Sequence, residues 1–301
     1  MTDVVTLASY SLGRPVADFT APYKAQDKCF ASQRLDGVTI EDADLQHCTF
    51  ANMGFKEARL QNGKFFDCIF IGCYFRRAQL MNCSFVGCRF IECTFPHAAL
   101  KSCDFRYAVF RGCQVPFFEM EYCLPTEPNL REHLARNLAL ESWRLGLSQD
   151  ARNYRRKELN AREEHLLAAV KGKPQWYKDH FDTLGRFRAL MGWCLSLLNR
   201  WLWGYGDRAW TLVRNLLLLA LLVFPGLFYA WRAQLVHSSG HDVSLWDVVY
   251  FSLENVVPSG IVSDVLAVGG VTRFLAGLES LFGVVVVALF AAYVFRWSLH
   301  R

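Results

Sequence analysis

The chain has 301 residues and a formal net charge of +5, and 52% of its residues are hydrophobic, 15% aromatic and 20% charged. This composition excludes intrinsic disorder, which requires few apolar residues and a high net charge. Five surplus positive charges are too few to indicate a nucleic-acid partner. Residues 1–28 form an N-terminal segment, and its first twenty residues lack the basic start and continuous apolar core of a signal peptide.

A period of five residues begins after this segment. Every fifth residue from Phe30 to Met120 is apolar, and sixteen of these nineteen residues are Phe or Leu. A second column, two positions earlier, holds Ala or Cys at thirteen of the fifteen positions from Ala43 to Cys113. Five matches neither the helical period of 3.6 nor the strand period of 2. It predicts a chain that turns a corner at every repeat and points one large and one small apolar side chain inward.

The cysteines follow the same repeat. Nine of the eleven share one phase of it: Cys48, Cys68, Cys73, Cys83, Cys88, Cys93, Cys103, Cys113 and Cys123. In that column a thiol serves as a small apolar side chain, interchangeable with Ala. No pair has the Cys-x-x-Cys spacing of a zinc site, so we expect no metal. Free thiols indicate a reducing compartment, which places this segment in the cytosol.

The two columns resemble the pentapeptide-repeat family over residues 29–123. The resemblance implies a right-handed quadrilateral β-helix with four repeats per coil and about 4.5 coils. Some members of that family mimic DNA through a strongly acidic rod. Residues 29–120 carry ten Lys or Arg against nine Asp or Glu, so the sequence does not predict DNA mimicry here.

Residues 124–208 predict cytoplasmic and interfacial helices. Segments 129–147 and 152–170 are rich in Arg, Glu, Leu and Ala. The basic face of the second is predicted to be solvated, with anionic lipid or a neighbouring subunit as the alternative. Between residues 176 and 210, aromatic and Arg residues are interleaved with the apolar residues of one helical face. This pattern is typical of a helix at the membrane interface. A core helix of a soluble domain is the alternative.

Residues 209–301 contain two apolar stretches, 210–231 and 271–297. The first has 22 residues, about 33 Å of helix, which is enough to cross a hydrocarbon layer of about 30 Å. Five Lys or Arg lie in residues 186–214, whereas the 40 residues between Arg232 and Arg273 have none. By the positive-inside rule, we expect a multi-pass membrane protein with both termini in the cytoplasm.

The stretch 245–264 between these spans begins with a short apolar segment, Trp246–Asn255, that is too short to cross the bilayer. Irregular backbone at membrane depth is tolerated only where it lines water or is buried in protein. We therefore predict a re-entrant pore helix followed by a filter loop.

From residue 200 to 298 the chain resembles the two-transmembrane ion-channel family with a potassium-channel-like pore. In the short segment the matches are Trp246-Asp247 and Tyr250-Phe251-Ser252. In the second span, Arg273, Glu279 and Gly283 match the family's Arg-x-x-x-x-x-Glu-x-x-x-Gly pattern. Residues 204–207 look like the lead-in of bacterial members that carry pentapeptide repeats. The resemblance implies a homotetrameric channel for inorganic ions in the bacterial inner membrane.

The filter departs from that family. Pro258–Ser263 stands where potassium channels have Thr-Val-Gly-Tyr-Gly-Asp, and only Gly260 is kept. Val262 replaces the second glycine, and a β-branched residue resists a positive φ. The carbonyl stack that replaces the hydration shell of potassium is therefore not expected. The sequence predicts a pore without potassium selectivity.

The predicted pore and filter residues are Glu254, Asn255, Val256, Val257, Pro258, Ser259, Gly260 and Ile261, with Asp264 at the outer mouth. In a tetramer each acidic residue forms a ring of four, and acidic rings favour cations. The alternative for Glu254 is a structural role, in which it bonds backbone N–H groups behind the loop.

The second span has further predicted roles. Glu279 braces the pore helix, Gly283 is the hinge, and Phe290 and Val294 are the constrictions. His237 and His241 in the outer loop are predicted to be solvated, with metal binding or pH sensing as the alternative.

We therefore expect a cation-conducting channel whose cytoplasmic repeat domain serves gating or assembly. The alternative is a membrane-anchored scaffold, in which the repeats bind a cytoplasmic partner and the two spans only tether them. The sequence has no P-loop, HExxH motif or nucleophile elbow, so we expect neither an enzyme nor a cofactor.

Overall fold

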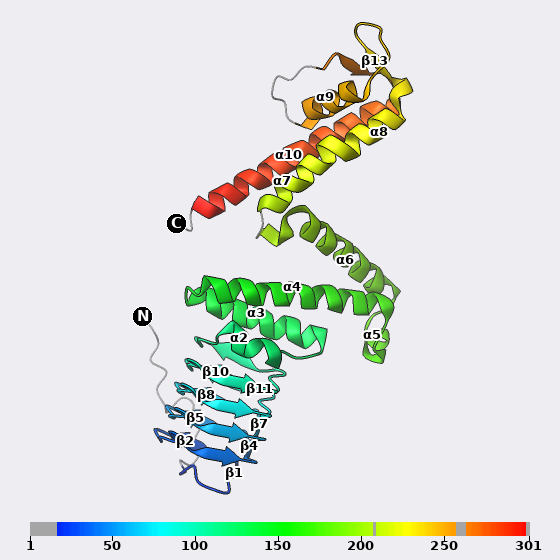
Figure 1. The fold of residues 1–301 in the computed structure, drawn as a ribbon. Helices are drawn as coiled ribbons and strands as arrows, with labels where there is room; N and C mark the ends of the chain where they lie inside the picture. The colour runs from blue at the N-terminus through cyan, green and yellow to red at the C-terminus, as the bar shows by residue number, and fades with distance from the viewer. Residues whose placement is uncertain (1–16, 207–208, 257–262, 299–301) are drawn as a thin grey trace, which may run out of the picture. The chain divides into compact units, whose positions relative to one another are not determined.

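The computed structural model describes residues 17–206, 209–256 and 263–298. The chain divides into two compact units, Met1–Leu190 and Met191–Arg301, and each is described by itself. Figure 1 shows the elements in chain order.

The first unit begins with a four-sided solenoid of short parallel strands, here called the rod. One side is a five-stranded sheet, in the order β12 (Val109–Arg111), β10 (Arg89–Ile91), β8 (Ile69–Ile71), β5 (Thr49–Ala51), β2 (Cys29–Ala31). A second side has the order β11 (Ala99–Lys101), β9 (Gln79–Met81), β6 (Arg59–Gln61), β3 (Thr39–Glu41). A third side has β1 (Lys24–Gln26), β4 (Asp44–Gln46) and β7 (Lys64–Phe66). Isolated bridges such as Tyr74↔Thr94 form the fourth side.

The register of the sheets gives the size of one coil. Phe30 pairs with Phe50, and Phe50 pairs with Phe70, twenty residues further along the chain each time. Twenty residues are four repeats of five, so each repeat supplies one side. The prediction of a β-helix is confirmed as a solenoid of about four turns.

Two columns of side chains fill the rod. The Phe50 and Phe70 rings stack with centroids 4.7 Å apart, close to the strand spacing of a β-sheet. The Cys68 thiol donates to the Leu45 carbonyl oxygen at 3.4 Å, and the Cys93 thiol donates to the Phe70 carbonyl oxygen at the same distance. Burial raises the pKa of Cys93 well above its ordinary value. These thiols therefore act as small packing groups that also bond the preceding coil.

Corners of the coil require a left-handed backbone. Asn52 and Asp67 lie at corners with φ of 52° and 48°, a conformation that Asn and Asp tolerate better than most residues. At the corresponding corner of the next coil, a Cβ on Gly87 would lie 1.9 Å from Oδ1 of Asp67. Glycine is therefore required there both by φ and by space.

Helices close the end of the rod at β12. They are α2 (Phe117–Met120), η1 (Glu121–Cys123), α3 (Pro128–Arg144) and α4 (Ser148–Lys171), and α5 (Gln175–His180) packs against the end of α4. The Asn137 side chain of α3 accepts from the Phe110 N–H and donates to the Phe110 carbonyl, both at 2.8 Å. Its amide thus makes the two backbone hydrogen bonds that a further coil would otherwise make with Phe110. Glu141 accepts from the Gly112 N–H at 2.7 Å, and the Tyr154 hydroxyl donates to the Val115 carbonyl at 3.1 Å.

The helix α6 (Thr183–Trp203) crosses the division between the units. The second unit continues with η2 (Gly204–Gly206), α7 (Ala209–Leu218), the π-helical η3 (Leu219–Val223), α8 (Phe224–Ala230), η4 (Arg232–Gln234) and β13 (Leu235–His237). It ends with α9 (Leu245–Val256), β14 (Val265–Ala267) and α10 (Gly270–Ser298).

Two helices of this unit are long and apolar enough to cross a membrane. They are Val213–Ala230, with a mean hydropathy of 1.8, and Gly270–Ala292, with 2.3. Only 28% and 17% of these windows are buried in the chain, whereas the core helix of a soluble protein is mostly buried. The two helices thus leave apolar surface for lipid or for other subunits.

Candidate functional site

The short helix α9 lies between the two apolar helices in sequence, and its beginning is fixed by a capping box. The Asp247 N–H donates to the Ser244 hydroxyl at 3.3 Å, and the Ser244 N–H donates to the Asp247 carboxylate at 2.9 Å. The Ser244 hydroxyl also donates to this carboxylate and lowers the pKa of Asp247 below its ordinary value. A Ser followed three residues later by Asp is a sequence signal for the start of a helix. This role explains the presence of Asp247 in the Trp246-Asp247 match to the ion-channel family.

One face of α9 packs into the protein. Val248, Phe251, Ser252 and Val256 are buried, and the Phe251 ring meets the Phe228 ring of α8 edge to face, with centroids 5.1 Å apart. On the other face, Trp246 and Tyr250 are exposed in this single chain. The helix is therefore held against α8, with aromatic side chains left for another neighbour.

A buried polar group connects α9 to both apolar helices. The Ser252 hydroxyl donates to the Ala220 carbonyl at 2.8 Å and also bonds Oε1 of Glu279 in α10. Ala220 lies in the π-helical turn η3, where the regular bonding pattern of the helix is interrupted. Glu279 is fully buried. The structure therefore places the predicted bracing residue against the predicted pore helix.

Glu254, before the predicted filter loop, bonds Ser263, after most of that loop. Its carboxylate accepts from the Ser263 N–H at 2.9 Å and from the Ser263 hydroxyl. This contact has the geometry of the structural alternative, in which the carboxylate bonds backbone N–H groups of the loop. Ser263 was not among the predicted site residues, because its partner lies nine positions earlier on the other side of the loop.

The end of α9 approaches α10 closely. A Cβ on Gly283 would lie 2.3 Å from the Val256 carbonyl oxygen, so glycine is required there by helix packing. Asn255, one position before Val256, is partly buried. Among the described residues, Nδ2 of Asn255 and Oε2 of Glu279 are buried without a hydrogen-bond partner.

The remaining predicted residues lie apart from this cluster. Asp264 is exposed, and its carbonyl accepts from the Ser238 N–H at 2.7 Å. Phe290 and Val294 are exposed on α10. Val257, Pro258, Ser259, Gly260 and Ile261 lie outside the described residues.

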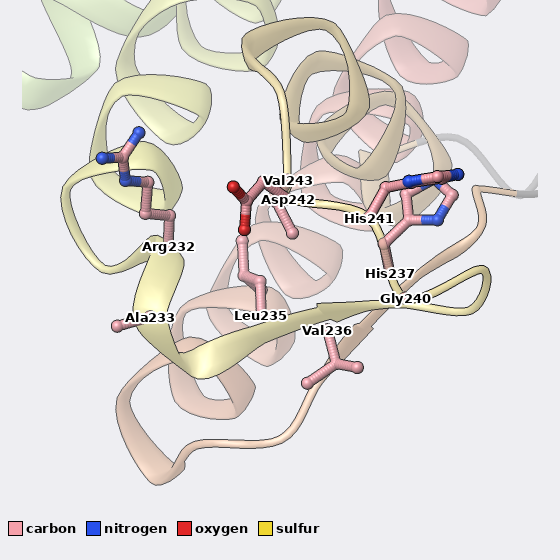
Figure 2. Close-up of a pocket in the computed structure, with 9 residues that line it drawn as sticks. All are labelled: Arg232, Ala233, Leu235, Val236, His237, Gly240, His241, Asp242 and Val243. Atoms are coloured by element: carbon pink, nitrogen blue, oxygen red, sulfur yellow. The ribbon is translucent and has the colours of Figure 1, made fainter.

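The segment from Arg232 to Val243, between α8 and α9, contains a cavity of about 420 Å³ (Figure 2). Figure 2 shows His237 and His241 together at one end, Arg232 at the other, and Asp242 between them. The two imidazole centroids are 6.5 Å apart, and Nδ1 of His237 bonds the Ser239 hydroxyl at 2.6 Å. Within the described ranges, no group of three His, Cys, Asp or Glu is arranged to hold a metal ion.

Comparison with known proteins bears on the rod. Residues 64–95 and 83–115 match the family model for pentapeptide repeats. Among solved structures, the chain is similar to HetL of the cyanobacterium Nostoc sp. strain PCC 7120, a pentapeptide-repeat protein involved in regulating heterocyst differentiation. The identity is 17%, the TM-score is 0.23, and the match covers 37% of this chain and 48% of HetL.

A second similar structure is QnrB1, a plasmid-mediated fluoroquinolone resistance protein, with 24% identity and a TM-score of 0.14. That match covers 29% of this chain and 48% of QnrB1. The chain thus spans about half the length of these two structures. A search of curated proteins finds no match. The family match and the register of the strands together show that the first unit contains a pentapeptide-repeat solenoid.

Proposed function

We propose that this chain is the pore-forming subunit of a cation channel in the bacterial inner membrane. In this proposal four copies surround a common axis, α9 is the re-entrant pore helix, and the loop after it lines the pore. The rod lies in the cytoplasm and serves gating or assembly.

The observation that carries the proposal is the attachment of α9. Its twelve residues make about 18 Å of helix, too short for a layer of about 30 Å. It is nevertheless apolar, and Ser252 connects it to η3 and to α10 inside the protein. A pair of helices that only tethers a rod needs no such element. A helix that must present a loop at membrane depth needs to be held in this way.

Charge supports a cation pathway. The carboxylate of Glu254 braces Ser263, and Asp264 follows directly with an exposed side chain. Fourfold symmetry would place four copies of Asp264 around the outer mouth, and an acidic ring attracts cations. Since Val262 and Pro258 replace filter residues of potassium channels, we propose cation conduction without potassium selectivity.

Recording from the purified full chain in planar bilayers tests this proposal. We expect unitary currents with a cation-selective reversal potential in a salt gradient. Asp264→Asn should reduce the cation-to-anion permeability ratio several-fold, because it removes the charge of the proposed ring. Asp242→Asn, on the same outer loop, is the matched control and should leave the ratio unchanged. Protein that inserts without conducting at any voltage or salt condition would contradict the proposal and leave a membrane-tethered rod.

A further inference from the structure

Two thiols meet at the closed end of the rod. Cys83, Cys103 and Cys123 occupy the same inward position, twenty residues apart each time. Cys103 lies just after β11, whereas Cys123 is the last residue of η1, which packs against β11. The two thiols are in hydrogen-bonding contact, and the Cys123 sulfur also accepts from the Cys103 N–H. The last pair of this column therefore connects a coil of the rod to the helices that close it.

The backbone holds this pair less tightly than it holds a pair between two coils. The Asp104 N–H donates to the Cys83 carbonyl at 2.9 Å, so the coils of Cys83 and Cys103 keep the strand spacing of about 4.8 Å. Parallel side chains at this spacing keep their Cβ atoms farther apart than the roughly 3.8 Å of a disulfide. Cys123 instead ends a 3₁₀ helix of three residues and is followed by extended backbone at Leu124. A short turn of this kind can close the gap, because its movement breaks no strand ladder.

Solvent also comes closest to this pair. Among the ten buried cysteines, Cys103 and Cys123 have the largest exposed fractions, 6% and 3%, whereas Cys68 and Cys88 are fully buried. Tyr122, the neighbour of Cys123, is strongly exposed. A small oxidant therefore reaches Cys103 and Cys123 before it reaches the thiols inside the coils.

The contacts of the pair favour a thiolate at Cys123. The Cys103 thiol contributes most to lowering the pKa of Cys123 to about 7, and the N–H groups of Cys103 and Ser102 add to this effect, while burial and the Glu119 carboxylate oppose it. The same contact raises the pKa of Cys103. The single hydrogen of the Cys103 thiol otherwise goes to the Leu80 carbonyl oxygen at 3.4 Å. A thiolate is the form of cysteine that reacts with peroxides.

We propose that Cys103 and Cys123 are a peroxide-sensitive dithiol, whose oxidation to a disulfide links the helical end covalently to the last turns of the rod. The link extends to α4, because Glu121 of η1 is ion-paired with Lys157 of α4 at 2.7 Å. In a reducing compartment such a bond is transient and forms only while peroxide is present. This proposal concerns the first unit alone and is independent of the proposed function.

The step balances with hydrogen peroxide as the oxidant. The Cys123 thiolate attacks one peroxide oxygen, the O–O bond breaks, and a sulfenic acid forms while hydroxide leaves and takes up a proton as water. The Cys103 sulfur then attacks the Cys123 sulfur, the S–O bond breaks, and the leaving hydroxide takes the Cys103 proton as a second water. The two sulfurs give two electrons to the peroxide, and dithiothreitol returns them by thiol–disulfide exchange.

Peptide mapping of the full chain in detergent tests the proposal. After treatment with hydrogen peroxide and alkylation, trypsin releases Cys103 in peptide 102–106 and Cys123 in peptide 112–131, where fragmentation distinguishes it from Cys113. We expect these two peptides to be linked through Cys103 and Cys123, at a rate at least about tenfold above that of any other pair in the rod. The unfolding midpoint of the first unit should rise by about 5 °C, because the bond closes a loop of about twenty residues. Dithiothreitol should reverse both changes.

The exposed Cys194 is the internal reference for the oxidant. If peroxide oxidises Cys194 and the linked peptide does not form, the proposal is wrong. It is also wrong if Cys83 and Cys103 become linked equally fast, because the pair at the closed end would then have no special reactivity.

Matched serine variants assign the two roles. Cys123→Ser should abolish the linked peptide and the rise in the unfolding midpoint. Cys103→Ser should leave a sulfenic acid at Cys123 that dimedone labels, and the absence of this label would overturn the assignment of Cys123 as the attacking thiol. Cys83→Ser, one coil earlier in the same column, is the control and should keep the linked peptide. Its loss in this variant too would mean that oxidation follows loosening of the whole column, and the assignment to this pair would be wrong.

Discussion

At the residue scale, the buried contacts of α9 show why particular amino acids are needed. The Ser252 hydroxyl has one hydrogen but bonds both the Ala220 carbonyl and Glu279. The Ala220 carbonyl and the Glu279 carboxyl share the one hydroxyl hydrogen as acceptors. A side chain at position 279 must therefore fill the space and offer an oxygen to Ser252.

Two substitutions of Glu279 separate these requirements. Glu279→Gln keeps the volume and a side-chain oxygen, so thermal stability in detergent should change little. Glu279→Ala leaves a cavity and removes a partner of Ser252, which should lower the free energy of unfolding by about 2–4 kcal/mol. Tryptophan fluorescence during heating measures the transition. Equal losses in both variants would show that the carboxylate itself is essential.

We expect His165 of α4 to make the stability of the first unit depend on pH. Nδ1 of His165 bonds the Tyr177 hydroxyl at 2.8 Å. Burial lowers the pKa of His165 below its ordinary 6.5, while nearby Glu132 opposes this shift and His133 reinforces it. Below pH 6.5 the unfolded chain therefore binds a proton that the folded chain resists, so stability falls as the pH decreases. Above pH 6.5 this residue contributes no slope.

Thermal unfolding between pH 5.5 and 7.5 measures this slope. His165→Gln keeps a polar side chain that does not titrate, and should flatten the part of the slope that His165 contributes. His180→Gln changes an exposed histidine of the same region and serves as the control. An unchanged slope in His165→Gln would assign the pH dependence to other groups.

At the element scale, Asn137 of α3 ends the stack of coils. Its amide bonds both backbone groups of Phe110, at the edge that the next coil would otherwise occupy. Asn137→Ala leaves these groups without the amide and should lower the free energy of unfolding by about 1–3 kcal/mol. The opened strand edge should also promote association between rods.

Light scattering after size-exclusion chromatography measures that association, and thermal unfolding measures the stability. Asn160→Ala removes an exposed asparagine of α4 and is the matched control. If Asn137→Ala behaves like this control, the helices close the rod by apolar packing alone.

The elements differ in how far the sequence could predict them. The rod was predictable because its register is an integer period, and a column of Phe or Cys can be counted without knowing any distance. The closure of the rod by Asn137 was not predictable, because Asn137 bonds Phe110 across 27 positions in the sequence. No local sequence pattern indicates where α3 will lie. The same reason applies to Glu254 and Ser263, which meet across the predicted filter loop. The Ser244 cap, by contrast, is local and readable.

At the scale of the whole molecule, the rod and the apolar helices need opposite environments. The rod and the helix η1 together contain ten buried cysteines, and the rod has a polar outer surface over most of its sides, whereas the second unit exposes long apolar helices. A solenoid whose core holds free thiols fits a reducing compartment. The segment between the two apolar helices has no Lys or Arg over 40 residues, as the positive-inside rule expects on the outer side of the proposed topology.

This arrangement predicts the sides of the membrane on which two engineered cysteines react. In a Cys194→Ala background, Ser239→Cys introduces a thiol into the proposed outer loop. Tyr122→Cys introduces one at a strongly exposed position at the closed end of the rod. A membrane-impermeant maleimide should modify position 239 in intact spheroplasts and position 122 only after permeabilisation, because Lys and Arg flanking the spans are retained on the cytoplasmic side. Modification of both positions in intact spheroplasts would place the rod outside. Protection of both until permeabilisation would mean that the loop between the spans does not reach the outer surface, and the two-span topology would be lost with it.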